Sequence, residues 1–152
     1  MQPFATDFLN SFESYHTEIE HAIDGLPKAA LDWSPGPDMN SIAVLVVHLA
    51  GAERYYLGDV IAGEPSNRDR PAEFRTKGLD ADTLKARLQT ATAYVRRILD
   101  GLTLEDLETM RIVPRDGSQR SVASCLLTVA THTAMHAGHI QLTRQLWEMR
   151  DD

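Results

Sequence analysis

Three histidines in this chain have the residue type and spacing of a metal site. His132 and His136 are four residues apart in the run Thr-His-Thr-Ala-Met-His-Ala-Gly-His, so in a helix they lie one turn apart on the same face. His48 lies in a separate apolar run, Ser-Ile-Ala-Val-Leu-Val-Val-His-Leu-Ala. If His48 faces the pair from another helix, three neutral nitrogens can share one divalent ion and leave coordination positions open for water or substrate.

The competing interpretation is that each histidine is an independent, hydrogen-bonded core residue, which is the commoner role of a single buried histidine. At about 100° per residue, His48 shares its helix face with mostly apolar or small neighbours and therefore points inward. These neighbours are Val44, Ala52, Tyr55 and Asp59. Because such faces offer few polar partners for three inward imidazoles, the sequence favours one shared ion.

Three further side chains are candidates for contact with a substrate or a proton. His139 lies on the same helix face as His132 and His136, where it could be a fourth ligand, a hydrogen-bond partner of a ligand, or a substrate contact. We favour a pocket role, since three ligands at this spacing would crowd one ion. Tyr55 and Asp59 lie two to three turns from His48 and could orient a ligand or move a proton. The simpler interpretation is that both are residues at the end of the bundle without a role in the site.

Other polar residues are predicted to lie away from the site. Glu53 points about 140° from His48, which makes it a poor general base. His16 and His21 lie about 80° and 140° from the centre of the apolar stripe on their helix, so both are expected to face solvent. Cys125 shares the face of the histidine pair but lies about 10 Å away along the axis, and it is expected to fill the core.

Four long stretches have the apolar period of a helix, and each is bounded by capping or breaking residues. They are residues 8–26, 41–63, 80–102 and 121–147. Ser41, Asp80 and Ser121 are suitable N-caps. Long polar connections separate these stretches, and residues 111–120 contain an Asp-Gly turn that could form a small hairpin or an ordered loop. The pattern predicts an all-α four-helix bundle and leaves the order of the helices open.

Composition limits the classes of protein to which the chain can belong. A length of 152 residues fits one domain, residues 1–152. The single cysteine cannot form an internal disulfide, and neither a membrane span nor a basic signal segment is present, so we expect a soluble cytoplasmic protein. The net charge of −7 and the scattered lysines and arginines argue against nucleic-acid binding.

The chain resembles the DinB-like (YfiT-like) family at two motifs. The first, Trp-Ser-Pro-Gly-Pro-Asp-Met-Asn-Ser-Ile from Trp33, precedes the helix of His48, and the second, His-Thr-Ala-Met-His-Ala-Gly-His-Ile-Gln-Leu-Thr-Arg-Gln-Leu, starts at His132. The resemblance implies an up-down-down-up bundle, often a homodimer. It also implies that His48, His132 and His136 hold zinc, nickel or a similar divalent ion, and the imidazole ligands make iron a further candidate. Many members carry Gln where this chain has His139.

The resemblance implies a small-molecule substrate, since characterised relatives include mycothiol- or bacillithiol-dependent transferases, a mycothiol-dependent maleylpyruvate isomerase and hydrolases. Three functions are compatible with such a site. In the first, the ion keeps a low-molecular-weight thiol as thiolate for S-transfer to a small electrophile. In the second, the ion activates water for hydrolysis. In the third, the protein is a non-catalytic metal- or ligand-binding stress protein, although an open three-ligand site argues against a purely structural ion.

Overall fold

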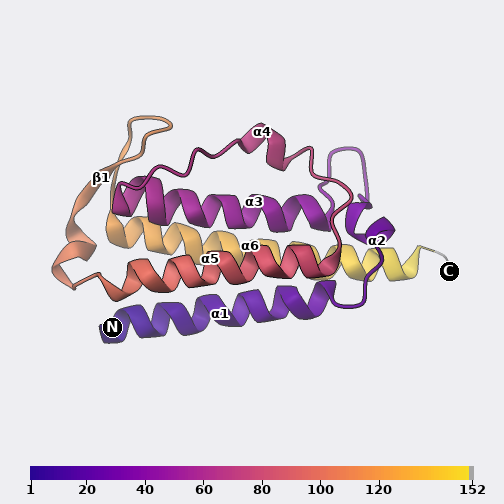
Figure 1. Ribbon diagram of the computed structural model, residues 1–152, viewed down its shortest axis with the longest axis horizontal. Coiled ribbons are helices and arrows are strands. Elements are labelled where there is room, and N and C mark those ends of the chain that lie inside the picture. Colours follow the sequence, from indigo (N-terminus) through magenta and orange to yellow (C-terminus); the bar gives the residue numbers. More distant parts are fainter. Residues whose placement is uncertain (151–152) are drawn as a thin grey trace.

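The computed structural model describes residues 1–150 and shows an all-α bundle of four long helices (Figure 1). The long helices are α1 (Pro3–Ile23), α3 (Ile42–Arg54) continued by the π-helix η1 (Tyr55–Ala62), α5 (Ala81–Asp100) and α6 (Val122–Met149). The short elements are α2 (Lys28–Asp32), α4 (Arg70–Glu73), the 3₁₀-helix η2 (Glu105–Glu108), β1 (Met110–Ile112) and β2 (Gln119–Ser121). The predicted fold class is confirmed.

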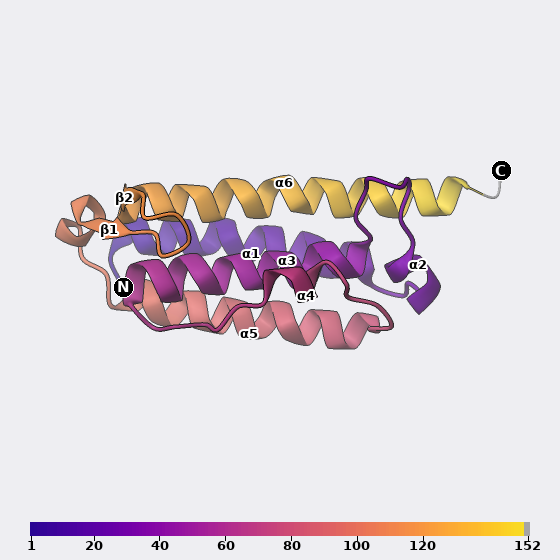
Figure 2. The ribbon, with the colours of Figure 1, turned by 90° about the horizontal axis from the view of Figure 1, so that it is seen from above.

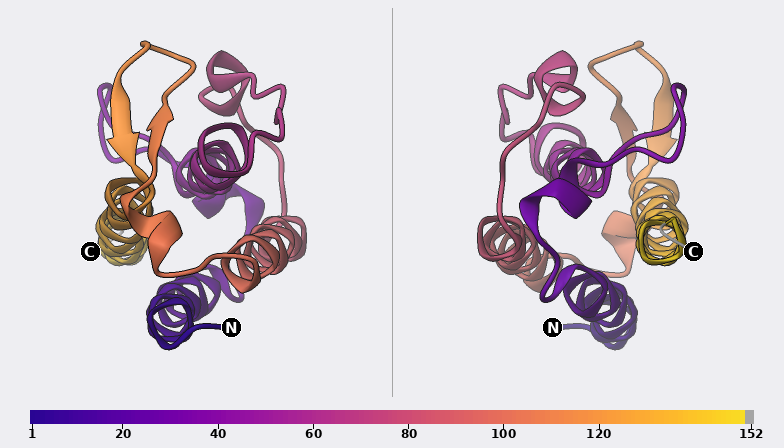
Figure 3. Two further views of the ribbon diagram at one scale, coloured as in Figure 1. Left: turned by 90° about the vertical axis from the view of Figure 1, so that its left-hand side faces the viewer. Right: turned by 90° about the vertical axis from the view of Figure 1, so that its right-hand side faces the viewer.

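The helices run up, down, down and up in chain order (Figure 1), as the resemblance implies. Seen along the bundle, α1 and α3 lie on one diagonal and α5 and α6 on the other (Figure 3). Because α3 and α5 run in the same direction, the segment 63–80 must return along the length of the bundle before α5 can begin. This crossover passes over α3 and carries α4 (Figure 2).

The predicted N-caps start the helices as expected. The side chains of Ser41, Asp80 and Ser121 each accept a hydrogen bond from the backbone N–H three residues later, at 3.3, 2.9 and 3.1 Å. Each cap satisfies one of the donors that a helix start leaves without a partner. The starts of α3, α5 and α6 are therefore set by local sequence.

The segment before α6 forms the hairpin that the Asp-Gly turn made possible. Strands β1 and β2 pair antiparallel, with Arg111 opposite Arg120. Gly117 has φ of 70°, a left-handed conformation that glycine adopts without steric cost. The Asp116 carboxylate accepts a hydrogen bond of 2.9 Å from the backbone N–H of Ser118. The hairpin leads directly into the first turn of α6.

The second long helix changes its hydrogen-bonding pattern near its middle. It is α-helical from Ile42 to Arg54 and π-helical from Tyr55 to Ala62, and it ends at Gly63 with φ of 69°. A π-helix pairs each residue with the fifth one along the chain and so turns less per residue than an α-helix. The face calculated at α-helical spacing from His48 therefore does not extend through η1.

A polar layer crosses the bundle between two apolar clusters of the core. Each long helix contributes one side chain to it: His16, Glu53, Thr92 and Thr133. His16 Nε2 lies 2.9 Å from Glu53 Oε1, and the Thr133 hydroxyl lies 3.0 Å from the same oxygen. Thr92 Oγ1 lies 2.8 Å from His16 Nδ1. The layer links all four helices at one level.

The expectation that His16 faces solvent is wrong, because its residue is only 3% exposed. Helix α1 packs against both α5 and α6, so its buried face is wider than its apolar stripe. The imidazole avoids an unpaired polar group in the core by pairing with Glu53, which is 1% exposed. His21 on the same helix is exposed, as predicted.

We expect His16→Ala to destabilise the protein strongly. The substitution removes a hydrogen-bond partner of a buried carboxyl group, and leaving a buried polar group unsatisfied costs about 1–3 kcal/mol. The matched control His21→Ala, on the exposed face of α1, should change the free energy of unfolding by less than about 0.5 kcal/mol. Urea denaturation followed by circular dichroism measures both, and equal stabilities would contradict the role assigned to the layer.

Candidate metal centre

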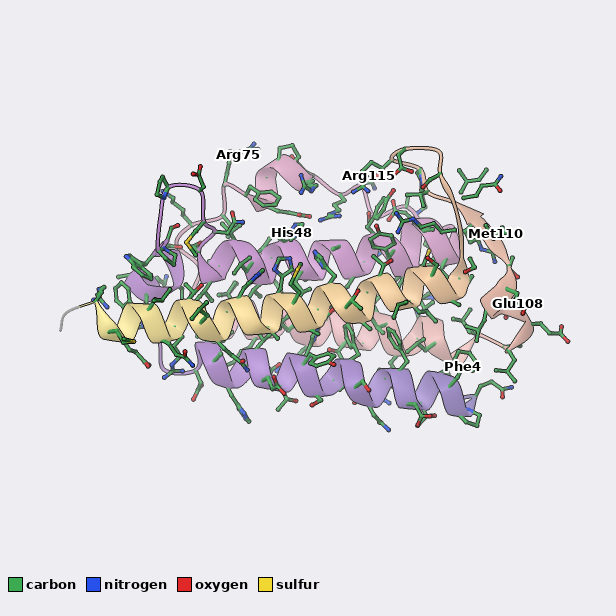
Figure 4. All side chains as sticks on the ribbon, turned by 180° about the vertical axis from the view of Figure 1, so that it is seen from behind. Phe4, His48, Arg75, Glu108, Met110 and Arg115 are labelled. Carbon is green, nitrogen blue, oxygen red and sulfur yellow. The ribbon has the colours of Figure 1, made fainter. Side chains whose placement is uncertain are left out.

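The three histidines singled out by spacing converge between α3 and α6. One nitrogen of each of His48, His132 and His136 lies within 4.8 Å of the corresponding nitrogens of the other two. The residues are largely buried, with His48 8% and His136 9% exposed. Figure 4 labels His48 where α3 lies beside α6, below α4. The convergence predicted from two separate segments is confirmed.

The arrangement of these nitrogens fits a divalent ion. Nε2 of His132 and Nε2 of His136 are 3.0 Å apart, and a tetrahedral zinc site with bonds of 2.0–2.1 Å places its nitrogens about 3.3 Å apart. The separation of this pair is therefore close to that of two ligands of one ion, and His48 completes a set within 4.8 Å. Three imidazoles without a carboxylate suit zinc, nickel or iron.

Burial keeps His132 and His136 neutral. It lowers the pKa of each to about 4, and neighbouring cationic groups add to the effect: His48, Arg68 and Arg70 for His132, and the other histidines for His136. A metal binds the unprotonated imidazole, so a ring with a low pKa does not have to lose a proton at neutral pH. Both imidazoles are therefore in the form that a metal ion would bind.

Glu73, the last residue of α4, fixes the orientation of His48. Its Oε2 lies 3.0 Å from His48 Nδ1, and Arg68 donates hydrogen bonds of 2.6 and 2.8 Å to its two carboxylate oxygens. Burial raises the pKa of Glu73, but the hydrogen bonds from His48 and Arg68 outweigh it and lower the pKa overall. With the Nδ1 proton donated to Glu73, Nε2 is the nitrogen of His48 that can bind an ion.

Gly51 leaves the space that the Glu73 carboxylate occupies. A Cβ at this position of α3 would overlap Glu73 Oε1 and would lie 3.2 Å from Arg68 Nε. The contacts of Gly51, Arg68 and Glu73 with one another were not predicted from the sequence. The only feature of the sequence that could have indicated these contacts is a glycine inside a helix, three residues after a candidate ligand. The segment 64–78 has no periodic pattern from which a contact with His48 could be predicted.

His139 contacts His136 on the side away from His132. The two Nδ1 atoms are 3.3 Å apart, whereas Nε2 of His136 faces His132. Of the three roles considered, the geometry favours a hydrogen-bond partner of a ligand over a fourth ligand. His139 is exposed, so a contact with substrate stays a prediction.

Tyr55 and Asp59 are held by connecting segments. The Tyr55 hydroxyl accepts a hydrogen bond of 3.0 Å from the backbone N–H of Arg115, in the hairpin. The Asp59 carboxylate accepts hydrogen bonds of 3.1 and 3.2 Å from the backbone N–H of Ser66, in the crossover. Both therefore have structural partners, and their role in moving a proton stays a prediction.

Cys125 and Glu53 lie apart from the three histidines, as expected. Cys125 is fully buried in the apolar cluster at the hairpin end, and burial raises the pKa of its thiol. Glu53 belongs to the polar layer. The chain's one thiol is thus protonated and inaccessible at neutral pH.

The sequence pattern that defines the DinB superfamily matches residues 11–140, and the chain belongs to this superfamily. No functionally curated protein matches it in sequence. Within residues 1–150, no helix has the length and apolarity needed to cross a membrane.

Solved structures share the fold at low sequence identity. A conserved protein from Enterococcus faecalis is 15% identical with a TM-score of 0.81, over 96% of this chain and 98% of that one. A DinB-like protein from Bacillus cereus is 19% identical with a TM-score of 0.73, over 93% and 91%. A mycothiol-dependent maleylpyruvate isomerase is 14% identical with a TM-score of 0.66, over 90% of this chain and 62% of that one.

We expect the metal-free protein to lose stability as the pH falls from about 6.5 to about 4. His132 and His136 have pKa values of about 4 when folded, against 6.5 when exposed. Between these values the unfolded chain binds more protons, so protonation favours unfolding. Urea denaturation measures the free energy of unfolding over this pH range. Its dependence on pH should be shallower in His136→Asn than in the wild type and unchanged in His21→Gln. If the free energy of unfolding of the wild type does not change over this pH range, the low pKa values of His132 and His136 are contradicted.

We expect Gly51→Ala to weaken metal binding without unfolding the protein. The added methyl group displaces the Glu73 carboxylate, which can move because it is the end of a flexible side chain. Losing the hydrogen-bond partner of a ligand histidine lowers metal affinity about 10–100-fold. Competition with a chromophoric chelator measures this loss.

The matched control is Gly138→Ala, also within a helix, where an added Cβ has no neighbouring atom within 4 Å. Its metal affinity should equal that of the wild type. Glu73→Gln should reproduce the loss without any steric change on α3. If Glu73→Gln binds zinc as tightly as the wild type, the carboxylate does not orient His48.

Proposed function

We propose that this protein is a metal-dependent enzyme in which His48, His132 and His136 hold a divalent ion that binds a low-molecular-weight thiol for transfer to a small electrophile. The observation that carries the proposal is the convergence of three ring nitrogens within 4.8 Å, with no carboxylate among them. Three neutral ligands leave coordination positions open, which is the arrangement of catalytic rather than structural sites.

When bound, a zinc, nickel or iron ion would lower the pKa of a thiol beside it and raise the fraction present as thiolate. The chain cannot supply this thiol itself, because Cys125 is buried and its pKa is raised. The thiol must therefore be a second small molecule that enters from solvent.

The surrounding residues hold the ligands in place. Glu73 orients His48 through Nδ1, and His139 contacts Nδ1 of His136, so both rings present Nε2 to the same point. Phe74 covers the His48 ring, with centroids 4.9 Å apart. His139 is the first candidate to receive or return a proton because it is exposed and adjacent to a ligand.

The mycothiol-dependent isomerase with the same fold makes thiol chemistry the first reaction to test. Hydrolysis by the same ion is the alternative reaction, with Tyr55, Asp59 or His139 handling the proton. A third possibility is that the protein binds a metal ion without catalysing a reaction. A homodimer, a cytoplasmic location and a lack of nucleic-acid contact remain predictions from the sequence.

The first test is metal retention. Wild-type protein purified without an affinity tag should contain close to one divalent ion per chain, and His136→Ala should lose most of it on dialysis because one of three ligands is gone. His21→Ala, an exposed histidine on α1, should retain it. Elemental analysis gives the content, and an unchanged content in His136→Ala would overturn the metal centre.

The second step separates the reactions. Zinc-, nickel- and iron-loaded proteins are assayed with pairs of thiols and electrophiles and, separately, with esters and amides. Thiol-dependent turnover that is lost in His136→Ala supports transferase chemistry. Turnover of esters or amides without thiol supports hydrolysis instead. Tight metal retention without turnover in any loaded form favours a metal-binding protein and counts against the proposal.

A further inference from the structure

The crossover that passes above the metal centre is a basic segment in an acidic chain. Residues 68–77 contain Arg68, Arg70, Arg75 and Lys77 but only Asp69 and Glu73 as acids, whereas the whole chain has a net charge of −7. The segment includes α4, which lies over α3 at the level of His48 (Figure 4). This part of the crossover therefore carries a net positive charge where it passes over α3.

Arg70 is the cation of this segment that lies against an aromatic ring in contact with His48. Arg68 is neutralised by two hydrogen bonds to Glu73, but Arg70 has no carboxylate partner within residues 1–150. Its guanidinium carbon lies 4.7 Å from the centroid of the Phe74 ring. Phe74 is 37% exposed and in turn lies against His48. A guanidinium and an accessible aromatic ring thus adjoin the metal centre.

The electrostatics of the centre favour a negatively charged ligand. The three candidate ligands are imidazoles with no carboxylate among them, and Glu73, the acid that contacts His48, is already paired with Arg68. A divalent ion would add to the positive charge of residues 68–77 without any carboxylate among its ligands to offset it.

We propose that the substrate of this site is a small carboxylate whose charged group pairs with Arg70 and whose apolar part packs on Phe74. Arg70 is then the residue that determines specificity, because a planar guanidinium can bind both oxygens of a carboxylate. Phe74 supplies an apolar surface between Arg70 and the ligand histidines. This inference rests on the proposed function, since it places the substrate beside the metal centre.

Binding of benzoate to the cobalt-loaded protein tests the inference without an activity assay. Visible absorption of cobalt and isothermal titration calorimetry both report binding, and benzamide serves as the neutral analogue. Wild type should bind benzoate at least about tenfold more tightly than benzamide. Arg70→Gln should weaken benzoate binding about 5–20-fold and leave benzamide unchanged, because a charge-assisted pair is lost. Arg70→Lys should retain part of the preference.

Two further variants complete the design. Phe74→Leu should weaken the binding of benzoate more than the binding of acetate, because acetate has no ring to pack on Phe74. Arg87→Gln should bind benzoate as the wild type does, because Arg87 is an exposed arginine of α5 in the groove between α3 and α5.

Equal affinity of wild type and Arg70→Gln for benzoate, equal binding of benzoate and benzamide, or no binding of either would overturn the inference. Failure of the proposed function is recognised separately. In that case the wild type does not retain cobalt, or His136→Ala retains it equally well. If the protein retains cobalt through the three histidines but binds benzoate equally well with and without Arg70, only the carboxylate proposal is contradicted.

Discussion

The buried carboxylate of Glu53 is the constraint on which the arrangement of the helices depends. A carboxylate that is 1% exposed needs hydrogen-bond partners inside the protein, and here Oε1 finds them in His16 on α1 and Thr133 on α6. Within residues 1–150, Oε2 has no hydrogen-bond partner. Apolar packing alone tolerates a shift of one helix along another, whereas these hydrogen bonds hold only at one alignment. The polar layer therefore specifies how the helices are placed lengthwise.

That alignment also determines the metal centre. Glu53 and His48 are five residues apart on α3, and Thr133 lies between the two ligand positions His132 and His136 on α6. Because α3 and α6 run antiparallel (Figure 1), a contact between Glu53 and Thr133 brings His48 level with the histidine pair. The three histidines thus lie next to the polar layer along the axis of the bundle, and they face the crossover instead of the core.

The topology supplies the rest of the site. Two neighbouring helices that run in the same direction need a connection as long as the bundle, and in this protein that connection lies across the open side of the histidines. It brings Glu73 to His48 and places Phe74 and Arg70 beside it. A segment required by chain connectivity therefore also orients a ligand and lines the approach to the ion.

The sequence by itself determined the helices, their caps and the histidines, because these depend on residues close together in the chain. A spacing of four fixes His132 and His136 on one face, and Ser41, Asp80 and Ser121 begin their helices through local hydrogen bonds. The tertiary structure decided the burial of His16, the π-helical turn after Arg54, and the contacts of Glu73 with His48. These features depend on partners 25 or more residues away or on a change in helical twist, and neither leaves a periodic pattern in the sequence.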